Sequence, residues 1–423
     1  MTSWRELVRL ESGVGPSHAM AFAALVVPIL AVHVPLGTVP AFIITAVLVF
    51  ALSWRRQGCL PSWGLSAGQT LCLLLVLAWA LASALLWNEN PRQAVGTWGG
   101  LTALALTASL LLGSARQADE GGRDLIRLGL ALGVTIAMLV TFLATFTPML
   151  DPAYAPAHDM FRRFLSRGVN INVLLLGPAL IALIRLRRWR WAGGLFLLGV
   201  VAVLGSHPLS AKVGLAVITL LFLSGLVWPR VTSLLTLGGI AVVMLSFPLL
   251  TALPDPQATS DMWPGLPNSA HHRLTIWKFT ADMTREHPLR GWGLDASRTI
   301  PGAEEHVPVW RPAIPPLASG EARYLVEEQR LPLHPHSGPG QVWLELGLTG
   351  VILLSMVLLV TIRSLPALGR RGDGAMAVAV LGGAVAIASV SFGLWQSWWQ
   401  ASLWLVAIFT AAVTAPNAAK TPD

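Results

Sequence analysis

The sequence predicts an all-α polytopic membrane protein with about 12 transmembrane helices and one large loop on a single face. Two features of its composition support this fold class: 54% of the 423 residues are hydrophobic and only 12% are charged. Soluble domains carry roughly 25% charged residues. A third feature is the recurrence of apolar runs long enough to cross a bilayer. These features exclude a soluble enzyme, a nucleic-acid-binding protein and a disordered scaffold.

Each predicted span is an apolar run close to the length that a membrane-crossing helix needs, about 20 residues. The runs lie at 19–33, 36–53, 68–87, 95–113, 125–147, 169–185, 191–207, 211–228, 231–252, 341–361, 375–393 and 399–415. The first two are short and are separated only around Pro35, so 11 spans is the alternative. Arg5 and Arg9 precede the first run as in a signal peptide, but no cleavage site follows. We therefore interpret it as a retained span.

Arginines in the short loops predict the orientation, because cytoplasmic loops carry an excess of basic residues. With the N-terminus inside the cell, the cytoplasmic loops contain Arg55, Arg56, Arg116, Arg123, Arg185, Arg187, Arg188, Arg190, Arg230, Arg363, Arg370 and Arg371. The opposite loops near Val34 and Trp395 contain no basic residue. Both termini are then cytoplasmic. The net charge of +8 is explained by these arginines and by anionic ligands without invoking nucleic acid.

The predicted organisation has three parts. Residues 1–252 form helices one to nine, residues 253–340 form a loop outside the cytoplasm, and residues 341–423 form helices ten to twelve with a short cytoplasmic tail. Within the loop, the range 268–287 is predicted to be an amphipathic helix that Pro288 ends. Trp277 would anchor this helix at the membrane surface.

Basic residues on the predicted outer face are exceptions to the usual distribution of charge. Three groups stand out, namely Arg162, Arg163 and Arg167, then Lys212, and then Arg273, Lys278, Arg285, Arg290 and Arg298 of the long loop. A single arginine there commonly contacts a lipid headgroup or water, and long loops escape the charge rule. Several arginines together could instead bind a pyrophosphate, because guanidinium groups form paired hydrogen bonds with phosphate oxygens.

The loop ends in His334, Pro335, His336 and Ser337, and Glu345 follows inside the tenth span. Histidine can take a proton from a hydroxyl near neutral pH, and an ionisable residue inside a span indicates function. Two histidines and one glutamate could alternatively bind zinc. Because Pro335 forces an extended backbone and no third ligand has helical spacing, proton transfer is favoured over metal binding.

These residues resemble the motifs of the bacterial O-antigen ligase/O-antigen polymerase superfamily. The motif that closes the family's large periplasmic loop is similar to a set of residues here, namely His334, Pro335, His336, Ser337, Gln341, Glu345, Gly347 and Gly350. Further similar segments are 273–277, 287–293, 210–212, and Arg167 with Asn170 and Asn172. Ser337 stands where the family usually has Asn, and Gly340 where it usually has a large apolar residue. The segment 299–332 matches no family motif and is predicted to be lineage-specific.

The resemblance implies a GT-C-type glycosyltransferase of the bacterial inner membrane that is active on the periplasmic face. It would move a glycan from undecaprenyl pyrophosphate to an acceptor hydroxyl, which in the ligase branch belongs to the lipid A-core. The expected partners are these substrates and membrane lipids, with no nucleic acid, metal or other cofactor.

Transfer leaves negative charge on the departing diphosphate, which fixed cations can stabilise in place of a metal. The cations expected to bind it are Arg167, Lys212 and Arg273, together with either Arg163 or Arg290. His336 is expected to accept the acceptor's proton, with His334 or Glu345 orienting it.

Two other functions are compatible with a polytopic membrane protein. A polymerase of the same superfamily would join repeat units to one another, and such polymerases often carry an Arg followed eleven positions later by Gly. The predicted outer loops lack that pattern, which favours a ligase. A transporter would place ionisable residues at mid-membrane and show internal repeats. Here the mid-membrane stretches lack charges and the polar groups gather on one face, so an enzyme is favoured.

Overall fold

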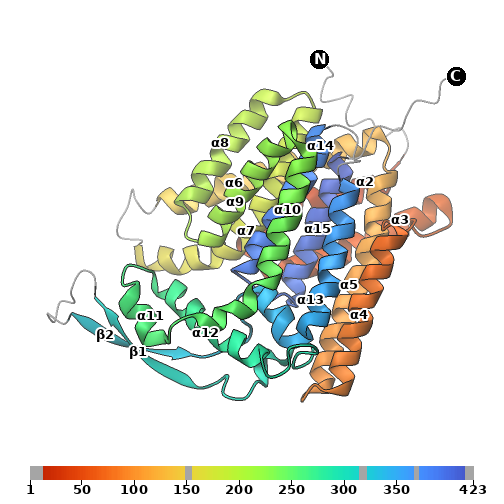
Figure 1. Cartoon of the computed structure of the whole chain (residues 1–423). Coiled ribbons are helices and arrows are strands. Elements are labelled where there is room, and N and C mark those ends of the chain that lie inside the picture. The colour runs from red at the N-terminus through yellow and green to blue at the C-terminus, as the bar shows by residue number, and fades with distance from the viewer. Residues whose placement is uncertain (1–12, 148–154, 314–321, 366–370, 415–423) are drawn as a thin grey trace.

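Long apolar helices occupy the ranges that were predicted to span the membrane (Figure 1). The computed structural model describes residues 13–147, 155–313, 322–365 and 371–414, with the side chains of 155–164 and Arg371 left out. The helices are α2 Pro16–His33, α3 Thr38–Gln57, α4 Ala67–Leu86, α5 Pro91–Gln117, α6 Glu120–Phe146, α7 Ala155–Arg185, α8 Trp189–Gly205, α9 Leu209–Val227, α10 Pro229–Leu245, α13 Gly338–Ser364, α14 Arg371–Ser389 and α15 Ser397–Thr414.

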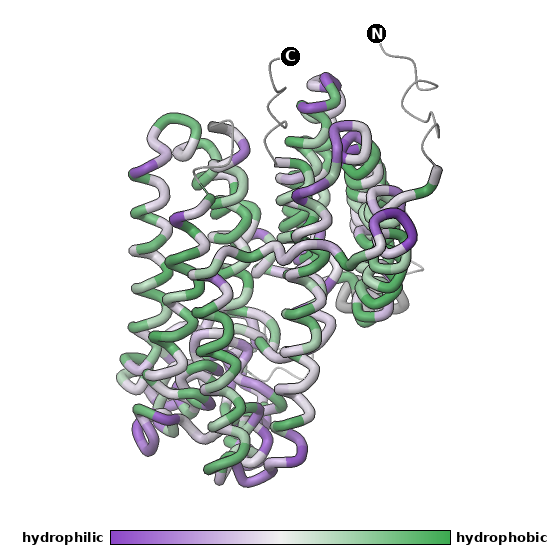
Figure 2. The backbone as a smooth tube through the Cα atoms, turned by 90° about the vertical axis from the view of Figure 1, so that its right-hand side faces the viewer, coloured by the Kyte–Doolittle hydropathy of each residue, from purple (hydrophilic) through white to green (hydrophobic). Residues whose placement is uncertain are grey.

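In the described part of the chain, nine helical segments are long and apolar enough to cross a membrane, and α8 and α10 are apolar but shorter. This confirms the predicted fold class, an all-α polytopic membrane protein. The first two predicted runs are separate helices, since the short helix η1 (Pro35–Gly37) stands between α2 and α3. Hydrophobic residues follow the helices along most of their length, and hydrophilic residues gather at the two ends of the bundle (Figure 2).

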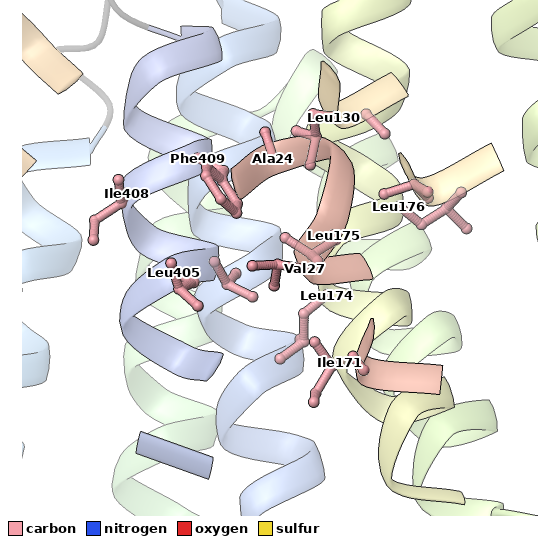
Figure 3. Packing of buried hydrophobic residues seen from close by; sticks show 14 of the residues in the cluster. Ala24, Val27, Leu130, Ile171, Leu174, Leu175, Leu176, Leu405, Ile408 and Phe409 are labelled. Atoms are coloured by element: carbon pink, nitrogen blue, oxygen red, sulfur yellow. The ribbon is translucent and has the colours of Figure 1, made fainter. Parts of the chain in front are cut away.

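The main apolar core joins helices that are distant in sequence. Ala24 and Val27 of α2 pack with Leu130 of α6, Leu174 of α7 and Phe409 of α15 (Figure 3). All five side chains are fully or almost fully buried. Because lipid is as apolar as these side chains, close packing rather than the hydrophobic effect holds such helices together.

Most of the chain between α10 and α13 forms a polar unit at one end of the bundle, which we call the loop face (Figure 1). It contains η4 Phe247–Ala252, α11 Pro256–Met262, α12 Asn268–Thr284 and η5 Ala296–Arg298, followed by an antiparallel hairpin of β1 His306–Pro312 and β2 Arg323–Gln329. Helix α12 occupies most of the range predicted to be amphipathic. The hairpin has no counterpart in the predicted elements. Pro308 and Pro312 argue against a strand, yet both strands of a two-stranded sheet are edges, where proline is tolerated.

Helix α13 is broken at Gly347, which has a φ of 64°. The break leaves backbone groups of α13 free, and the crossing segment 288–293 pairs with them. Leu348 N–H donates to the Pro288 carbonyl, and Trp292 N–H donates to the Leu344 carbonyl, both at 2.8 Å. At Gly291, where φ is 69°, a Cβ atom would lie 2.4 Å from the carbonyl carbon of Glu345. The glycines thus allow two backbones to meet directly.

We expect the substitution Gly291→Ala to destabilise the protein by about 2 kcal/mol or more, because the methyl group meets backbone and the φ value is unfavourable. Thermal unfolding of the full chain in detergent measures this. Gly239→Ala is the matched control, since nothing lies within 4 Å of a Cβ atom there. Equal melting temperatures for the two variants would contradict the packing described.

Candidate active site

The His-Pro-His segment forms a turn immediately before α13. His336 has a φ of 52°, which is uncommon for a residue with a side chain. Its backbone N–H donates to Nδ1 of His334 at 3.2 Å, and the two rings meet edge to face with centroids 4.3 Å apart. The indole of Trp277 on α12 donates to the Pro335 carbonyl at 3.0 Å. Neighbouring elements therefore hold this uncommon conformation in place, as is typical of functional sites.

The partner of His336 determines its tautomer. Nδ1 lies 2.9 Å from the carbonyl oxygen of Ser391, in the connection between α14 and α15. Since a carbonyl only accepts, Nδ1 carries the hydrogen and Nε2 keeps a lone pair. The pKa of His336 is lowered, mainly by burial, and the charges of Arg273 and His272 lower it further. The hydrogen bond to Ser391 has the opposite effect but does not outweigh them. The imidazole is therefore neutral near pH 7 and can accept a proton at Nε2.

His334 is in a different chemical state. Burial lowers its pKa to about 3, and the charges of His336, Arg298 and Arg167 add to the effect. Its ring packs on Gly393, where a Cβ atom would lie 2.9 Å from the ring. Because Nδ1 accepts from the backbone of His336, His334 acts as a neutral acceptor that holds the conformation of its neighbour.

Three guanidinium groups from three elements act on this pair of histidines. Arg273 of α12 is half-buried and affects His336, while Arg167 of α7 and Arg298 of η5 are exposed and affect His334. Arg167 also lies over the ring of Trp398, at 5.6 Å from its centroid. Among the residues that the structure describes, none of the three arginines forms an ion pair with a carboxylate. Their charge is available to an anionic ligand beside a neutral base.

The other predicted cations lie elsewhere or outside the described residues. Lys212 lines a cavity of about 290 Å³ that also contacts Leu165 and Val169 of α7. Arg290 lies over the ring of Trp87, 5.9 Å from its centroid, in the crossing segment. The side chain of Arg163 is outside the described residues. The structure therefore brings Arg167 and Arg273 to the histidines.

Sequence reasoning did not assign Arg298 to this site, although it counted Arg298 among the basic residues of the loop. The contributions of Trp398, His272 and the Ser391 carbonyl were also missed. No local pattern distinguishes these groups, because their position depends on how α12, η5 and the connection between α14 and α15 fold together.

Glu345 is fully buried, and its carboxylate accepts four hydrogen bonds. One oxygen accepts from the backbone N–H of Asp295 and the indole of Trp395, both at 2.5 Å. The other accepts from Ser297 at 2.6 Å and from the amide of Gln341 at 3.0 Å. Four donors fill the acceptor sites of a carboxylate, and none of them belongs to a histidine ring.

The segments bound by Glu345 also build the histidine site. The connection that carries Trp395 supplies the Ser391 carbonyl to His336 and places Gly393 against His334. The segment of Asp295 and Ser297 continues into Arg298. Glu345 therefore links the segments that surround the histidine turn.

The described residues contain no group of three or more His, Cys, Asp or Glu side chains that could hold a metal ion. The charged groups that act on His334 and His336 include Arg167, Arg273 and Arg298, and none of these is a metal ligand. A zinc site needs at least a third protein ligand, and the described side chains around His334 and His336 do not supply one.

We expect Glu345→Gln to lower the thermal stability of the protein, because a glutamine amide has one acceptor oxygen and leaves buried donors without a partner. Each unpaired buried donor costs about 1–3 kcal/mol. Unfolding of the detergent-solubilised chain, followed by near-ultraviolet circular dichroism, measures the change. Glu304→Gln, at an exposed position of the same loop, is the control and should leave the transition unchanged.

Comparison with known proteins finds similarity over the segment that contains most of this site. Residues 194–355, which extend from α8 into α13, match the model of the O-antigen ligase family. Proteins that bear the name polysaccharide ligase are similar to this chain. The one from Rickettsia conorii is 26% identical over 256 residues, which is 59% of this chain and 58% of that protein. The one from Rickettsia bellii is 27% identical over 209 residues, 49% of this chain and 48% of that protein.

A third, from Rickettsia prowazekii, is 28% identical over 170 residues, 40% of this chain and 39% of that protein. The aligned part spans about half the length of the curated relatives it matches. The matched segment contains Lys212, Arg273, His334, His336 and Glu345. With the resemblance of the motifs, these findings support a relationship of this chain to the O-antigen ligase superfamily.

Proposed function

We propose that the protein is a metal-independent glycosyltransferase of the O-antigen ligase type. It moves a glycan from undecaprenyl pyrophosphate to a sugar hydroxyl of the lipid A-core, on the periplasmic side of the bacterial inner membrane, with both chain termini in the cytoplasm. The observation that carries the proposal is the neutral His336, with a lone pair on Nε2, beside Arg273, which has no carboxylate partner among the described residues.

In the proposed reaction the acceptor oxygen attacks the anomeric carbon of the donor, and the bond from that carbon to the diphosphate oxygen breaks. The acceptor's proton passes to Nε2 of His336. Negative charge grows on the leaving diphosphate, where Arg273, Arg167 and Arg298 stabilise it. Fixed cations aimed at developing charge can supply the stabilisation that a divalent metal gives in other enzymes.

Lys212 is proposed as a further contact of the diphosphate. The cavity beside it is bounded by the turn of α7 that carries Arg167, since Leu165 and Val169 line it. Arg163 and Arg290 remain candidates for an additional contact. The long apolar helices around this cavity would accommodate the polyprenyl chain.

Deleting the gene, and then restoring it on a plasmid as the control, distinguishes two activities of the superfamily. Loss of a ligase leaves long chains on the lipid carrier, whereas loss of a polymerase leaves a single repeat unit attached to the core. Gel analysis of the cell-surface glycans distinguishes the two results, and the second would overturn the proposed ligase.

We expect Arg273→Ala to reduce the rate of transfer by roughly a hundredfold or more, since one missing donor to developing charge costs about 2.7–4 kcal/mol. The measurement is transfer by the purified protein with EDTA present, where the unmodified protein should keep its rate. Arg285→Ala, an exposed residue at the end of α12, should remain active. An active Arg273→Ala variant would refute the assigned role, and loss of activity in EDTA that added zinc or magnesium restores would refute metal independence.

The lowered pKa of His336 predicts the pH dependence of transfer. The neutral imidazole is the active form, so kcat/KM is constant above its pKa and falls as the pH drops through it. That fall lies below the ordinary histidine value of 6.5. Arg273→Gln removes a charge that lowers this pKa, so the residual activity should decline at a higher pH. An acid limb at or above pH 6.5 in the unmodified protein would contradict proton acceptance by His336.

A further inference from the structure

Helices α4 and α5 meet beside the loop face (Figure 1), and their polar side chains hold Leu294 and Asp295, which follow the crossing segment. The backbone N–H of Leu294 donates to the Ser83 hydroxyl at 3.1 Å, and the Leu294 carbonyl accepts from the Asn88 amide at 2.7 Å. All three residues are buried. Because a buried backbone group without a partner is costly, these side chains fix the path of the chain.

The carboxylate of Asp295 joins the loop face to α5. Its Oδ2 atom accepts from the Gln93 amide at 3.0 Å and from the Thr97 hydroxyl at 2.9 Å. The backbone of Asp295 is left-handed, with a φ of 60°, and its N–H donates to Glu345. Among the residues that the structure describes, no ion pair joins Asp295 to Arg298. The carboxylate therefore serves as an anchor and does not neutralise the arginine that follows it.

Helix η5 begins immediately after Asp295 and carries Arg298, whose charge acts on His334. The chain on both sides of Arg298 is packed. Ser297 is fully buried. An apolar cluster joins η5 to α12 and α13, and its buried members are Ile276, Ala296, Ile300, Ala303, Leu331 and Leu344. Arg298 itself is exposed, so its charge faces solvent from a backbone that is held in place.

A cation that stabilises developing charge is effective when it is already in position before the reaction. An exposed arginine on an unsupported loop would have to be ordered at each turnover, and that ordering costs conformational entropy. Here the backbone next to Arg298 is tied to α5 through Asp295 and to α13 through Glu345. Two long apolar helices thus fix the position of a charge that lies outside the bundle.

We propose that Asp295 is a positioning residue, which through Gln93 and Thr97 holds Arg298 where it binds the diphosphate of the donor. The inference rests on the proposed function, which supplies that diphosphate. The hydrogen bonds of Asp295 are responsible, and its charge is not required, since both donors meet one oxygen atom. An asparagine could place its carbonyl oxygen there, and asparagine tolerates the left-handed conformation.

The test is a double-mutant cycle in the full chain in detergent. Titration calorimetry measures the affinity for farnesyl diphosphate, and kcat of glycan transfer should follow the same pattern. Arg298→Ala should weaken binding by about tenfold. Asp295→Ala should weaken it by a comparable factor, whereas Asp295→Asn should bind like the unmodified protein. The double variant should bind no more weakly than Arg298→Ala, because both substitutions remove one contact.

Thr97→Val tests the same anchor without changing residue 295, and it completes the cycle if Asp295→Ala does not fold. It should weaken binding by about threefold in the unmodified protein and have no effect when Arg298 is already alanine. Thr135→Val is the matched control, because this half-buried threonine of α6 donates within its own helix, to the Ala131 carbonyl. The control should bind like the unmodified protein.

The positioning role is refuted if the effects of Asp295→Ala and Arg298→Ala multiply in the double variant. It is also refuted if Asp295→Asn binds as weakly as Asp295→Ala, if neither Asp295→Ala nor Thr97→Val weakens binding, or if the unmodified protein does not bind farnesyl diphosphate. An unmodified protein that binds the diphosphate with the expected pattern, yet transfers no glycan, would refute the proposed function alone.

Discussion

The arrangement of the loop face depends on the hydrogen bonds that the buried carboxylate of Glu345 accepts. A carboxylate cannot be buried in an apolar bundle unless its acceptor sites are filled, and four donors from three parts of the chain fill them. Two donors, Asp295 and Ser297, follow the crossing segment. Gln341 belongs to α13 itself, and Trp395 belongs to the connection between α14 and α15. Satisfying this one group therefore fixes the position of segments that are far apart in sequence. The break at Gly347 lets the crossing segment 288–293, which leads into Asp295, pair with the backbone of α13.

In the histidine turn, the hydrogen-bond partners of His334 and His336 determine which ring nitrogen of each keeps a lone pair. His334 receives a backbone N–H at Nδ1, so its lone pair is used within the turn. His336 gives its Nδ1 hydrogen to a carbonyl, so its other nitrogen keeps a lone pair that faces no assigned partner. Burial keeps both rings neutral. Only His336 combines neutrality with a free acceptor, and that combination is what a proton-accepting group requires.

The sequence was informative where the determining interactions are local. Apolar runs predicted the spanning helices, and the range that Pro288 ends predicted α12, because hydropathy and helix boundaries depend on neighbouring residues. The hairpin was missed since Pro308 and Pro312 oppose a strand locally, while Arg311 and Glu328 meet across it only in the folded chain. Glu345 was expected to orient a histidine, yet its contacts are with backbone and other side chains. Arg298 was seen only as one basic residue of many, because convergence is a property of the fold.

Pairing distinguishes the arginines that stabilise the fold from those that could bind a ligand. Arg127, Arg185 and Arg311 are buried or nearly so and meet carboxylates, as burial of a charge demands. Arg273 is half-buried, and its pKa is lowered by that burial, yet no described carboxylate compensates it. An uncompensated, partly desolvated charge reduces stability unless an anion occupies the site. Arg273 acts on the imidazole of His336, and Arg167 and Arg298 act on that of His334, so an anion bound near the two rings would offset the three charges. In the proposed function that anion is the diphosphate of the donor, and its scissile bond would then lie beside His336.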